Sequence, residues 1–520
     1  MFRFINFLIF FILAFKLSFG QNYFSKRLNL FNKASFTQWG GFYKADTIIL
    51  LNNIYETYFP NPVQYAGLFK ISVSDGSVLS SFKFGSAKYN NLVGVDILKQ
   101  NNSYFAQNID GSNYSVVTAI AKVTLGLDTV FTKTYGDTNY YFYQTRILPF
   151  KKTKNKLLLF GATDSTFGTN HPNKSRPFLR VVDTNGVLHQ TKIYLNNLTS
   201  LLNLWNVDTT VKKGYILSGN TYAGNINRHF ILKLDSNLTQ EWVRYIDTSS
   251  SIAAHAQPVK KGGYILSHAK TISINVNSLL AEDKIALTRL DGNGNIKWRK
   301  VYGNAEPYLS PIRVRECLNG DFIIAGYRRF YYTPSVSQDL GCLIRTDSLG
   351  NLKWWKQYIQ TSPIKDTIAV ATIYDLTELP NKDFIGIGTL SSSSISGQLF
   401  STWLLKVDSN GCFSGSNCPN NTYVGLQEVD VWPQNKLVFN VYPNPANEII
   451  NVELESVNGD PIKNYKLEII NSLGQLVLAS SLGEDGRGAF NISKCPRGIY
   501  FVKLTSNNQA TLSKKIIIER

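Results

Sequence analysis

The chain has 520 residues, of which 43% are hydrophobic and 13% aromatic, and its formal net charge is +18. Such a chain can bury a large core, and its length alone would suggest about three domains. Only 17% of the residues are charged, no Cys-x-x-Cys pair occurs, and the five histidines share no metal-ligand spacing. We therefore expect no zinc site and no cofactor.

The N-terminus has the pattern of a secretory signal peptide. Arg3 precedes an apolar run over residues 4–15, and the small residues Ser18 and Gly20 precede Gln21. Residues 1–20 are expected to be removed on export. Lys16 ends the apolar run early, and no later segment reaches the roughly 18 to 20 apolar residues of a membrane-spanning helix. No cysteine follows the cut, so we expect neither a transmembrane segment in the mature chain nor a lipid anchor.

Most of the chain repeats one short unit. Its clearest copy, IALTRLDGNGNIKWRKVYG over residues 285–303, reads as a strand, a tight turn and a second strand. Related units occur at positions 75, 124, 183, 235, 291, 347 and 408, and all but the second begin their turn with aspartate: Asp75, Asp183, Asp235, Asp291, Asp347 and Asp408. Five units carry an aromatic residue seven positions later: Phe82, Phe131, Trp242, Trp298 and Trp354.

The repeat predicts an all-β fold. A second pair of hydrophobic segments precedes each turn, as in KKGYILSGNTY from Lys212. Each unit therefore holds four strands that are too short and too rich in glycine for helices. Residues 22–425 are expected to form a β-propeller of about seven four-stranded blades. The last unit lacks its fourth strand near Gly411, and residues 22–31 are expected to supply it, with Phe24 in the aromatic position, so that the ring closes.

The repeated aspartates and aromatics are expected to be structural. An aspartate that opens an Asp-x-Asn-Gly turn bonds to its own backbone, and glycine supplies the positive φ. Asp291 and its neighbours also resemble the start of a calcium loop, but the further oxygen ligands are missing. The aromatic spacing resembles the tryptophan-docking repeats of quinoprotein propellers without any cofactor signature. We expect the rings to pack between blades.

A group of lysines recurs in the turn between the first two strands of three successive units, at residues 151, 152, 154 and 156, at 212 and 213, and at 260 and 261. These turns share one face of a propeller, so the sequence predicts a basic arc with Lys152, Lys212, Lys213, Lys260 and Lys261 as candidate ligand-binding residues. The arc either keeps the surface soluble or attracts an anionic polysaccharide or lipopolysaccharide. Nucleic acid is not expected, because no reading motif accompanies the charge.

The loops on the other face are uneven and aromatic, and binding often resides in such loops. The candidate ligand-binding residues there are Arg328, Arg329, Tyr331 and Tyr332, which would stack on sugars or pair with acidic groups, or else pack within the loop. No catalytic motif occurs, so no catalytic residue is assigned. A pair of carboxylates for glycoside cleavage stays open, because spatial separation decides it.

The five cysteines lie in the second half of the chain. Cys412 and Cys418 are close enough to bridge, and export to an oxidising compartment permits a disulfide. Cys317 and Cys342 fall in one blade as either a pair or two thiols, and Cys495 is left over. Residues 412–437, rich in Ser, Asn, Pro and Gly, are expected to be a linker that overlaps the end of the propeller.

The final segment, residues 438–520, resembles the type A C-terminal sorting domain of the type IX secretion system of Bacteroidetes. Three motif blocks carry the resemblance in the family's order: Tyr442, Pro443, Asn444 and Pro445; Asn471, Leu473, Gly474 and Gln475; and Gly498, Tyr500, Lys514 and Lys515. The resemblance implies an Ig-like β-sandwich that directs the chain across the outer membrane and is removed by a sortase-like peptidase. One departure is Cys495, where the family has a Leu-like residue.

Together these features predict an exported binding or adhesion protein rather than an enzyme. The expected partners are the secretion machinery, its sortase-like peptidase and an anionic polysaccharide or lipopolysaccharide. Two alternatives stay open: an enzyme that acts on polysaccharide, and a structural component of the cell surface or matrix.

Overall fold

The chain divides into two units, residues 1–432 and 433–520, and its described secondary structure consists of β-strands. The computed structural model describes residues 23–30, 34–36, 40–44, 46–57, 63–84, 92–100, 103–110, 117–125, 129–136, 141–164, 175–195, 201–223, 226–249, 254–275, 280–303, 309–333, 336–361, 368–392, 400–413, 418, 421–425, 427–431, 437–456, 465–471, 475–481, 483, 487–506 and 511–519. No helix long and apolar enough to cross a membrane occurs among them.

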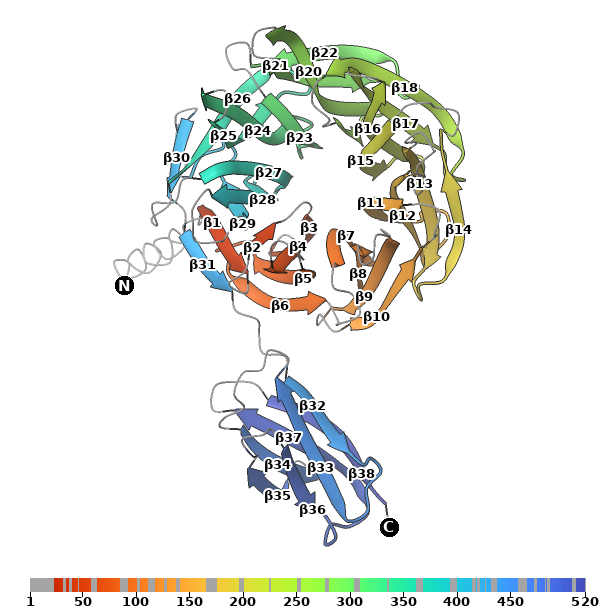
Figure 1. Cartoon of the computed structure of the whole chain (residues 1–520), viewed down its shortest axis with the longest axis vertical. Helices are drawn as coiled ribbons and strands as arrows, with labels where there is room; N and C mark the ends of the chain where they lie inside the picture. The colour runs from red at the N-terminus through yellow and green to blue at the C-terminus, as the bar shows by residue number, and fades with distance from the viewer. Residues whose placement is uncertain are drawn as a thin grey trace, which may run out of the picture. The chain divides into compact units, whose positions relative to one another are not determined.

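The described strands of the first unit form a seven-bladed propeller (Figure 1). The first blade holds β2 (Ala34–Phe36), β3 (Gly40–Lys44), β4 (Thr47–Thr57), β5 (Val63–Ser72) and β6 (Val78–Phe84). The second blade holds β7 (Leu92–Gln100), β8 (Ser103–Asp110), β9 (Val117–Thr124) and β10 (Thr129–Tyr135), and the third holds β11 (Tyr141–Pro149), β12 (Lys156–Asp164), β13 (Ser175–Asp183) and β14 (Leu188–Ile193). The fourth blade holds β15 (Leu201–Thr209), β16 (Tyr215–Ala223), β17 (Ile226–Leu234) and β18 (Gln240–Ser249). Within each blade the strands pair antiparallel in chain order, with β2 and β3 both on β4.

The remaining blades follow the same order. The fifth blade holds β19 (Ala254–Pro258), β20 (Tyr264–Asn275), β21 (Leu280–Leu290) and β22 (Ile296–Tyr302). The sixth blade holds β23 (Leu309–Glu316), β24 (Phe322–Thr333), β25 (Val336–Thr346) and β26 (Leu352–Thr361). The seventh blade holds β27 (Ile368–Glu378), β28 (Phe384–Ser392) and β29 (Phe400–Val407), and β1 (Phe24–Leu30) completes it. The first strand of each blade lies nearest the middle of the ring and the fourth lies outside (Figure 1). The all-β propeller predicted from the repeat is confirmed.

The ring closes through the N-terminal strand. β1 pairs antiparallel with β29, from Phe24 opposite Lys406 to Leu28 opposite Thr402. Phe24 and Leu28 are buried in a core that also holds residues of the first and seventh blades. The predicted closure is therefore confirmed, and β29 does not present a bare edge.

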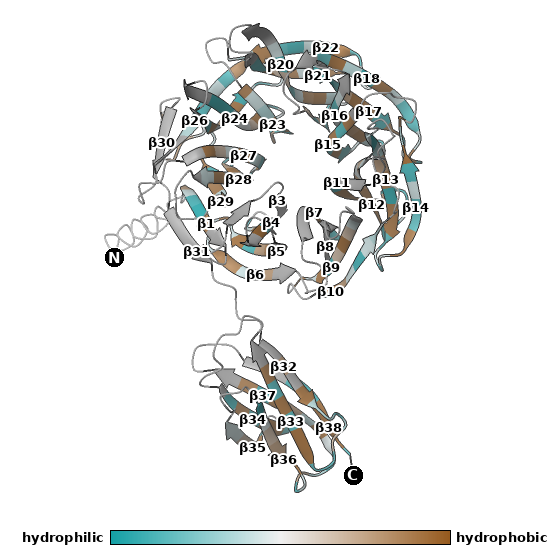
Figure 2. Cartoon of the chain, in the orientation of Figure 1, coloured by the Kyte–Doolittle hydropathy of each residue, from teal (hydrophilic) through white to brown (hydrophobic). Residues whose placement is uncertain are grey.

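Apolar packing between neighbouring blades holds the ring together. Burial falls from the inner to the outer strands, since β13 is buried along nearly its whole length while β14 is largely exposed. Figure 2 shows hydrophilic stretches on outer strands such as β14 and β18. The buried clusters each draw residues from adjacent blades, as expected when a repeat cannot bury its hydrophobic face alone.

Each Asp turn is closed by its own backbone. In the fifth blade, Oδ1 of Asp291 accepts the NH groups of Asn293 (2.8 Å) and Asn295 (2.9 Å). Gly294 follows at φ +83°. The aspartate oxygens are thus occupied within the turn, and among the described residues no group of three or more His, Cys, Asp or Glu side chains could hold a metal. This geometry supports the structural interpretation of the repeated aspartates over calcium binding.

The repeated aromatics dock onto the turn of the next blade. A side chain added at Gly350 would lie 2.7 Å from the ring of Trp298. Trp298 also packs against Phe322 of that blade, with ring centroids 6.4 Å apart. Four residues after Trp298, the hydroxyl of Tyr302 donates to the carbonyl of Gly350 (2.8 Å). Phe24 takes the same place over Gly76, so aromatic docking also joins the seventh blade to the first.

The segment after the propeller is more ordered than the linker expected there. Cys412 and Cys418 form a disulfide, and β30 (Asn421–Gly425) and β31 (Gln427–Val431) follow it. β30 pairs parallel with the outer strand β26, and β31 pairs parallel with β1. Backbone groups on the outer blade edges, which local composition does not reveal, bind this segment. Cys317, Cys342 and Cys495 are buried and form no disulfide, and burial raises the pKa values of the first two to about 12.

The second unit is a two-sheet sandwich. One sheet holds β32 (Leu437–Tyr442), β33 (Ile449–Ser456) and β36 (Arg487–Asn491). The other holds β35 (Leu476–Ser481), β34 (Tyr465–Asn471), β37 (Gly498–Ser506) and β38 (Thr511–Ile518), paired in that order. Both sheets contribute to one core, which also contains Cys495. The buried thiol therefore takes an apolar position, as a Leu-like residue would.

Candidate ligand-binding site on the inner strands

Six blades place a polar side chain at the same position of the inner strand. Counted by register against the second strand, these residues are Asp96, Arg146, Asn206, His255, Arg313 and Asp375, and we call them the inner cluster. The equivalent position of the first blade lies outside the described residues. A register shift stands immediately before the polar residue in every one of the six except His255. Bulges re-aim the next side chain.

Arg313 joins several blades. It is fully buried. Its Nη1 donates to Oδ1 of Asn206 (3.0 Å) and to Nε2 of His255 (2.6 Å), and its Nε lies 3.3 Å from the carboxylate of Asp375. These partners come from the fourth, fifth and seventh blades. One side chain of the sixth blade thus ties four blades together.

His255 is neutral in this setting. A guanidinium only donates, so Nε2 of His255 accepts from Arg313, and the backbone NH of Val314 lies 3.3 Å from Nδ1 on the other side of the ring. Burial, and then the positive charge of Arg313, hold the pKa of His255 well below its usual value. The imidazole is therefore an acceptor in the inner cluster and adds no positive charge.

Two carboxylates balance the arginines. Asp375 also bonds Arg315, whose Nη2 lies 2.9 and 3.2 Å from the two carboxylate oxygens. Burial opposes ionisation of Asp375, but Arg313 and Arg315 outweigh it, so its pKa lies below the usual range. Asp96 lies 3.2 Å from Nε of Arg146. Burial dominates there and raises the pKa of Asp96.

A cavity of about 640 Å³ opens beside this cluster, and we call it the inner cavity. Asp96, Arg146, Arg315 and Asp375 line it, together with residues at the ends of the inner strands of the second, sixth and seventh blades. The side chains of Arg146 and Arg315 are 15% and 28% exposed. The volume falls within the range of small-molecule sites.

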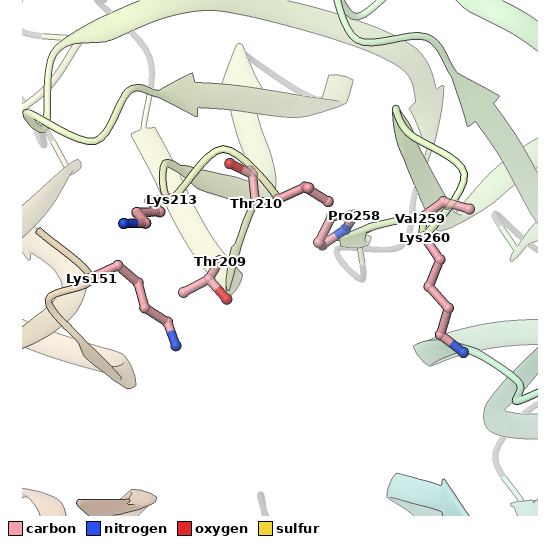
Figure 3. Close-up of a pocket in the computed structure, with 8 residues that line it drawn as sticks. Lys151, Thr209, Thr210, Lys213, Pro258, Val259 and Lys260 are labelled. Atoms are coloured by element: carbon pink, nitrogen blue, oxygen red, sulfur yellow. The ribbon is translucent and has the colours of Figure 1, made fainter.

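The lysine turns form a second cavity, of about 470 Å³, which we call the turn cavity. Lys151, Lys213 and Lys260 line it from the third, fourth and fifth blades, with Thr209 and Pro258 between them (Figure 3). Nζ of Lys260 donates to the carbonyl of Cys317 (3.2 Å), which lines the inner cavity. The two cavities are therefore neighbours on the same face.

The other predicted lysines are placed differently. Lys152 turns outward and donates to Oδ1 of Asn237 (2.5 Å), and Lys151 takes its place in the turn cavity. Lys212 lines an adjoining cavity of about 520 Å³ with Lys260. Lys261 is exposed in the same turn as Lys260. Chain direction at a tight turn decides which of two consecutive lysines faces inward, so the sequence pattern cannot separate them.

The predicted arginines of the loop-rich face lie apart from both cavities. Arg329 forms a two-point ion pair with Asp339 (2.7 and 2.8 Å), and Arg328 donates to Gln357 (3.3 Å). Both lie in β24 beyond the residues that pair with the inner cluster. The side chains of Tyr331 and Tyr332, and the loop that follows, lie outside the described residues. Arg329 is thus committed to a contact within its own blade.

The sorting-motif residues form three sets of hydrogen bonds in the sandwich. Asn444 donates to the carbonyl of Lys515 (2.9 Å) and accepts from the NH of Ile517 (2.9 Å), so the first motif block is tied to the last strand. Asn471 and Gln475 bond through backbone and side chain across the central turn. Tyr500 donates to the carbonyl of Pro496 (2.9 Å). Leu473 and Gly474 lie outside the described residues.

The inner cluster was missed at the sequence level, although a weak signal exists. In the last four blades the polar residue stands nine positions before the aromatic that opens the second strand: Asn206 and Tyr215, His255 and Tyr264, Arg313 and Phe322, Asp375 and Phe384. The residue types differ from blade to blade, so they do not read as a motif. Their complementarity appears only when the ring closes.

Comparison with known proteins identifies the second unit. Residues 440–519 match the family model described as a secretion system C-terminal sorting domain. No curated protein matches the chain. Solved structures with similar folds include the phage phi92 endosialidase (10% identity, 95% of this chain and 87% of that one, TM-score 0.45) and Sqt1 from Chaetomium thermophilum (10% identity, 74% and 99%, TM-score 0.39). An α-L-arabinofuranosidase from Fusarium graminearum matches at 11% identity over 62% and 94% of the chains, with a TM-score of 0.36. These likenesses are too distant to carry a function.

Proposed function

We propose that this type IX secretion cargo, whose C-terminal sorting domain directs it across the outer membrane, uses its propeller to bind an anionic polysaccharide at the face that carries the lysine turns. The supporting observation is that Lys151, Lys213 and Lys260, from three successive blades, line one cavity (Figure 3). Convergent positive charge on a rigid scaffold raises the local concentration of a polyanion. In this proposal the propeller binds the ligand and the sorting domain carries the export signal.

The carboxylates of the inner cavity support binding over hydrolysis. Asp96, Glu316, Asp375 and Glu378 line it, but each already accepts from the protein. Asp96 and Asp375 face arginines, while Glu316 accepts the NH of Lys260 (2.7 Å) and Glu378 accepts the NH of Leu318. Glycoside cleavage needs one carboxylic acid and one free carboxylate on the substrate. The two aspartates are thus paired with arginines, and each of the two glutamates holds a backbone NH.

The test measures binding of the full chain to polygalacturonate, lipopolysaccharide and neutral dextran at low and high salt. A triple variant, K151Q/K213Q/K260Q, is expected to weaken polyanion binding by about tenfold or more, because each lost charge removes a screened attraction. The control, K154Q/K261Q/K382Q, removes the same charge from turns of the third, fifth and seventh blades at residues that do not line the turn cavity. Equal losses in both variants would reduce the effect to general charge, and absence of binding together with self-association would favour a structural role.

A further inference from the structure

We propose that Arg146 and Arg315 form a carboxylate-binding subsite in the inner cavity, which takes the acid group of a single sugar unit. The inference rests on the proposed function, since it names the chemical class that the propeller recognises. Both arginines line the cavity with exposed surface, at the ends of inner strands from the third and sixth blades. The site is thus built from segments far apart in sequence.

Buried carboxylates hold both guanidinium groups in place. Nη2 of Arg315 is fixed by Asp375 at 2.9 and 3.2 Å, and Nε of Arg146 lies 3.2 Å from Asp96. The two aspartate side chains are only 1% and 5% exposed. An arginine anchored in this way has lost its rotamer freedom before a ligand arrives, so little further entropy is lost on binding.

Both guanidinium groups keep donors that their aspartate partners do not use, and both residues line the cavity. Within the described residues, no protein group bonds Nε and Nη1 of Arg315, or Nη1 and Nη2 of Arg146. A guanidinium offers parallel N–H donors that match the two oxygens of a carboxylate. Two such groups at one cavity therefore suit a planar monoanion.

The charges around the cavity decide against a more highly charged ligand. Around the cavity, three arginines (146, 313 and 315) face two aspartates (96 and 375). Burial opposes the charge of Arg315, but Asp375, and after it Asp208, raise its pKa. Glu316 and Glu378 stand at the rim with Lys99. Negative rim groups repel a dianionic phosphate, whereas their oxygens can accept hydrogen bonds from sugar hydroxyls. The arrangement fits a uronic acid better than a phosphate or a neutral sugar.

The position of the subsite also fits a polymer. Lys260 lines the turn cavity, and its backbone NH and Nζ bond Glu316 and Cys317 of the inner cavity. A chain with one acid group on Arg146 and Arg315 would pass over Lys260 toward Lys213 and Lys151. Specific recognition at the inner cavity and general attraction at the turns would then act on the same ligand.

The experiment titrates the full chain with free D-galacturonate and D-glucuronate, with galactose and inorganic phosphate as comparison ligands, by calorimetry or ligand-observed NMR. A uronate is expected to bind and galactose not to bind. R315Q and R146Q are each expected to weaken uronate binding by at least about tenfold. R299Q is the matched control. The Arg299 side chain is 24% exposed and pairs with Asp247 (2.8 Å), and neither residue lines the inner cavity. If R315Q does not fold, R315K tests the same point, because lysine keeps the positive charge but lacks the parallel N–H donors of a guanidinium.

Several results would overturn the subsite. These are equal binding of galactose, displacement of the uronate by phosphate at the same concentration, or wild-type affinity in R315Q and R146Q. If polygalacturonate binds through the three lysines but free uronate does not bind, the subsite fails and the proposed function stands. If free uronate binds through the arginines but no polymer binds, the subsite stands and the proposed polymer-binding function fails.

Discussion

Asp375 balances two buried arginines, Arg313 and Arg315, and its side chain is 1% exposed. Removing its charge leaves both guanidinium groups without their main counter-ion in a dry environment. D375N is therefore expected to lower the free energy of unfolding by about 3 to 5 kcal/mol. The control is D247N, whose partner Arg299 is partly exposed, and a loss of about 1 kcal/mol or less is expected. Denaturant unfolding of both variants measures the difference; similar losses would contradict the role given to the inner cluster.

Three buried histidines are expected to make the propeller less stable in acid. Burial lowers the pKa of His229 to about 4 and holds the pKa values of His255 and His268 well below the usual value. Below pH of about 6.5 the histidines bind protons in the unfolded chain but stay neutral in the folded chain. The free energy of unfolding is therefore highest above that pH and decreases as pH falls. Each histidine contributes a slope that rises to about 1.4 kcal/mol per pH unit between about 6.5 and its folded pKa.

The pH effect is measured as the denaturation midpoint between pH 7.5 and 5. H229N is expected to flatten the dependence, whatever it does to stability at pH 7.5. H189Q is the control, because His189 lies at the surface beside Asp183. An unchanged slope in H229N would show that the imidazole titrates normally in the folded chain.

At the scale of the element, one hairpin turn contains its own matched pair of glycines. Gly294 has φ +83°, and an added Cβ would lie 3.0 Å from the ring of Trp242 in the preceding blade. Gly292, two residues earlier, has nothing within 4 Å. G294A is expected to cost about 1 to 2 kcal/mol through backbone strain and displaced packing, and G292A a few tenths. Equal costs, measured by denaturation, would contradict the docking of the aromatic on the turn.

At the scale of the whole molecule, closure depends on a strand from the far end of the chain. Deleting residues 23–30 removes β1 and leaves β29 and β31 without their shared partner. The variant is expected to aggregate or unfold at lower temperature, because an unpaired edge binds other chains. Deleting residues 421–431 leaves the β1–β29 pairing intact and is expected to have a milder effect. Light scattering and thermal unfolding compare the two, and the reverse order would contradict closure by β1.

Much of the fold could be predicted because its signals are local and repeated. The Asp-Gly turns, the aromatic seven residues later and the hydrophobic segments before them each specify a hairpin or its packing surface. Phe24 was recognisable as a displaced copy of the aromatic, which placed the N-terminal strand in the last blade. Three motif blocks likewise identified the sorting domain.

The candidate site was predicted only in part. The lysine turns were visible as repeated residues, yet Lys151 rather than Lys152 lines the turn cavity. The inner cluster was not visible, because Arg313 and Asp375 acquire meaning only from partners in other blades. The order of the segment after Gly411 was also missed, since β30 and β31 bond to distant strand edges.

The sequence by itself determined the strands, their turns, the order of the blades and the sorting domain, because each depends on residues close together in the chain. Only the tertiary structure decided which side chains converge at the middle of the ring. Bulges precede Arg146, Asn206 and Arg313 in their strands, and the packing of the blades brings Arg146 to Asp96 and Arg313 to Asn206 and Asp375. Ion pairing at the centre depends on contacts between neighbouring blades, and no single repeat encodes it.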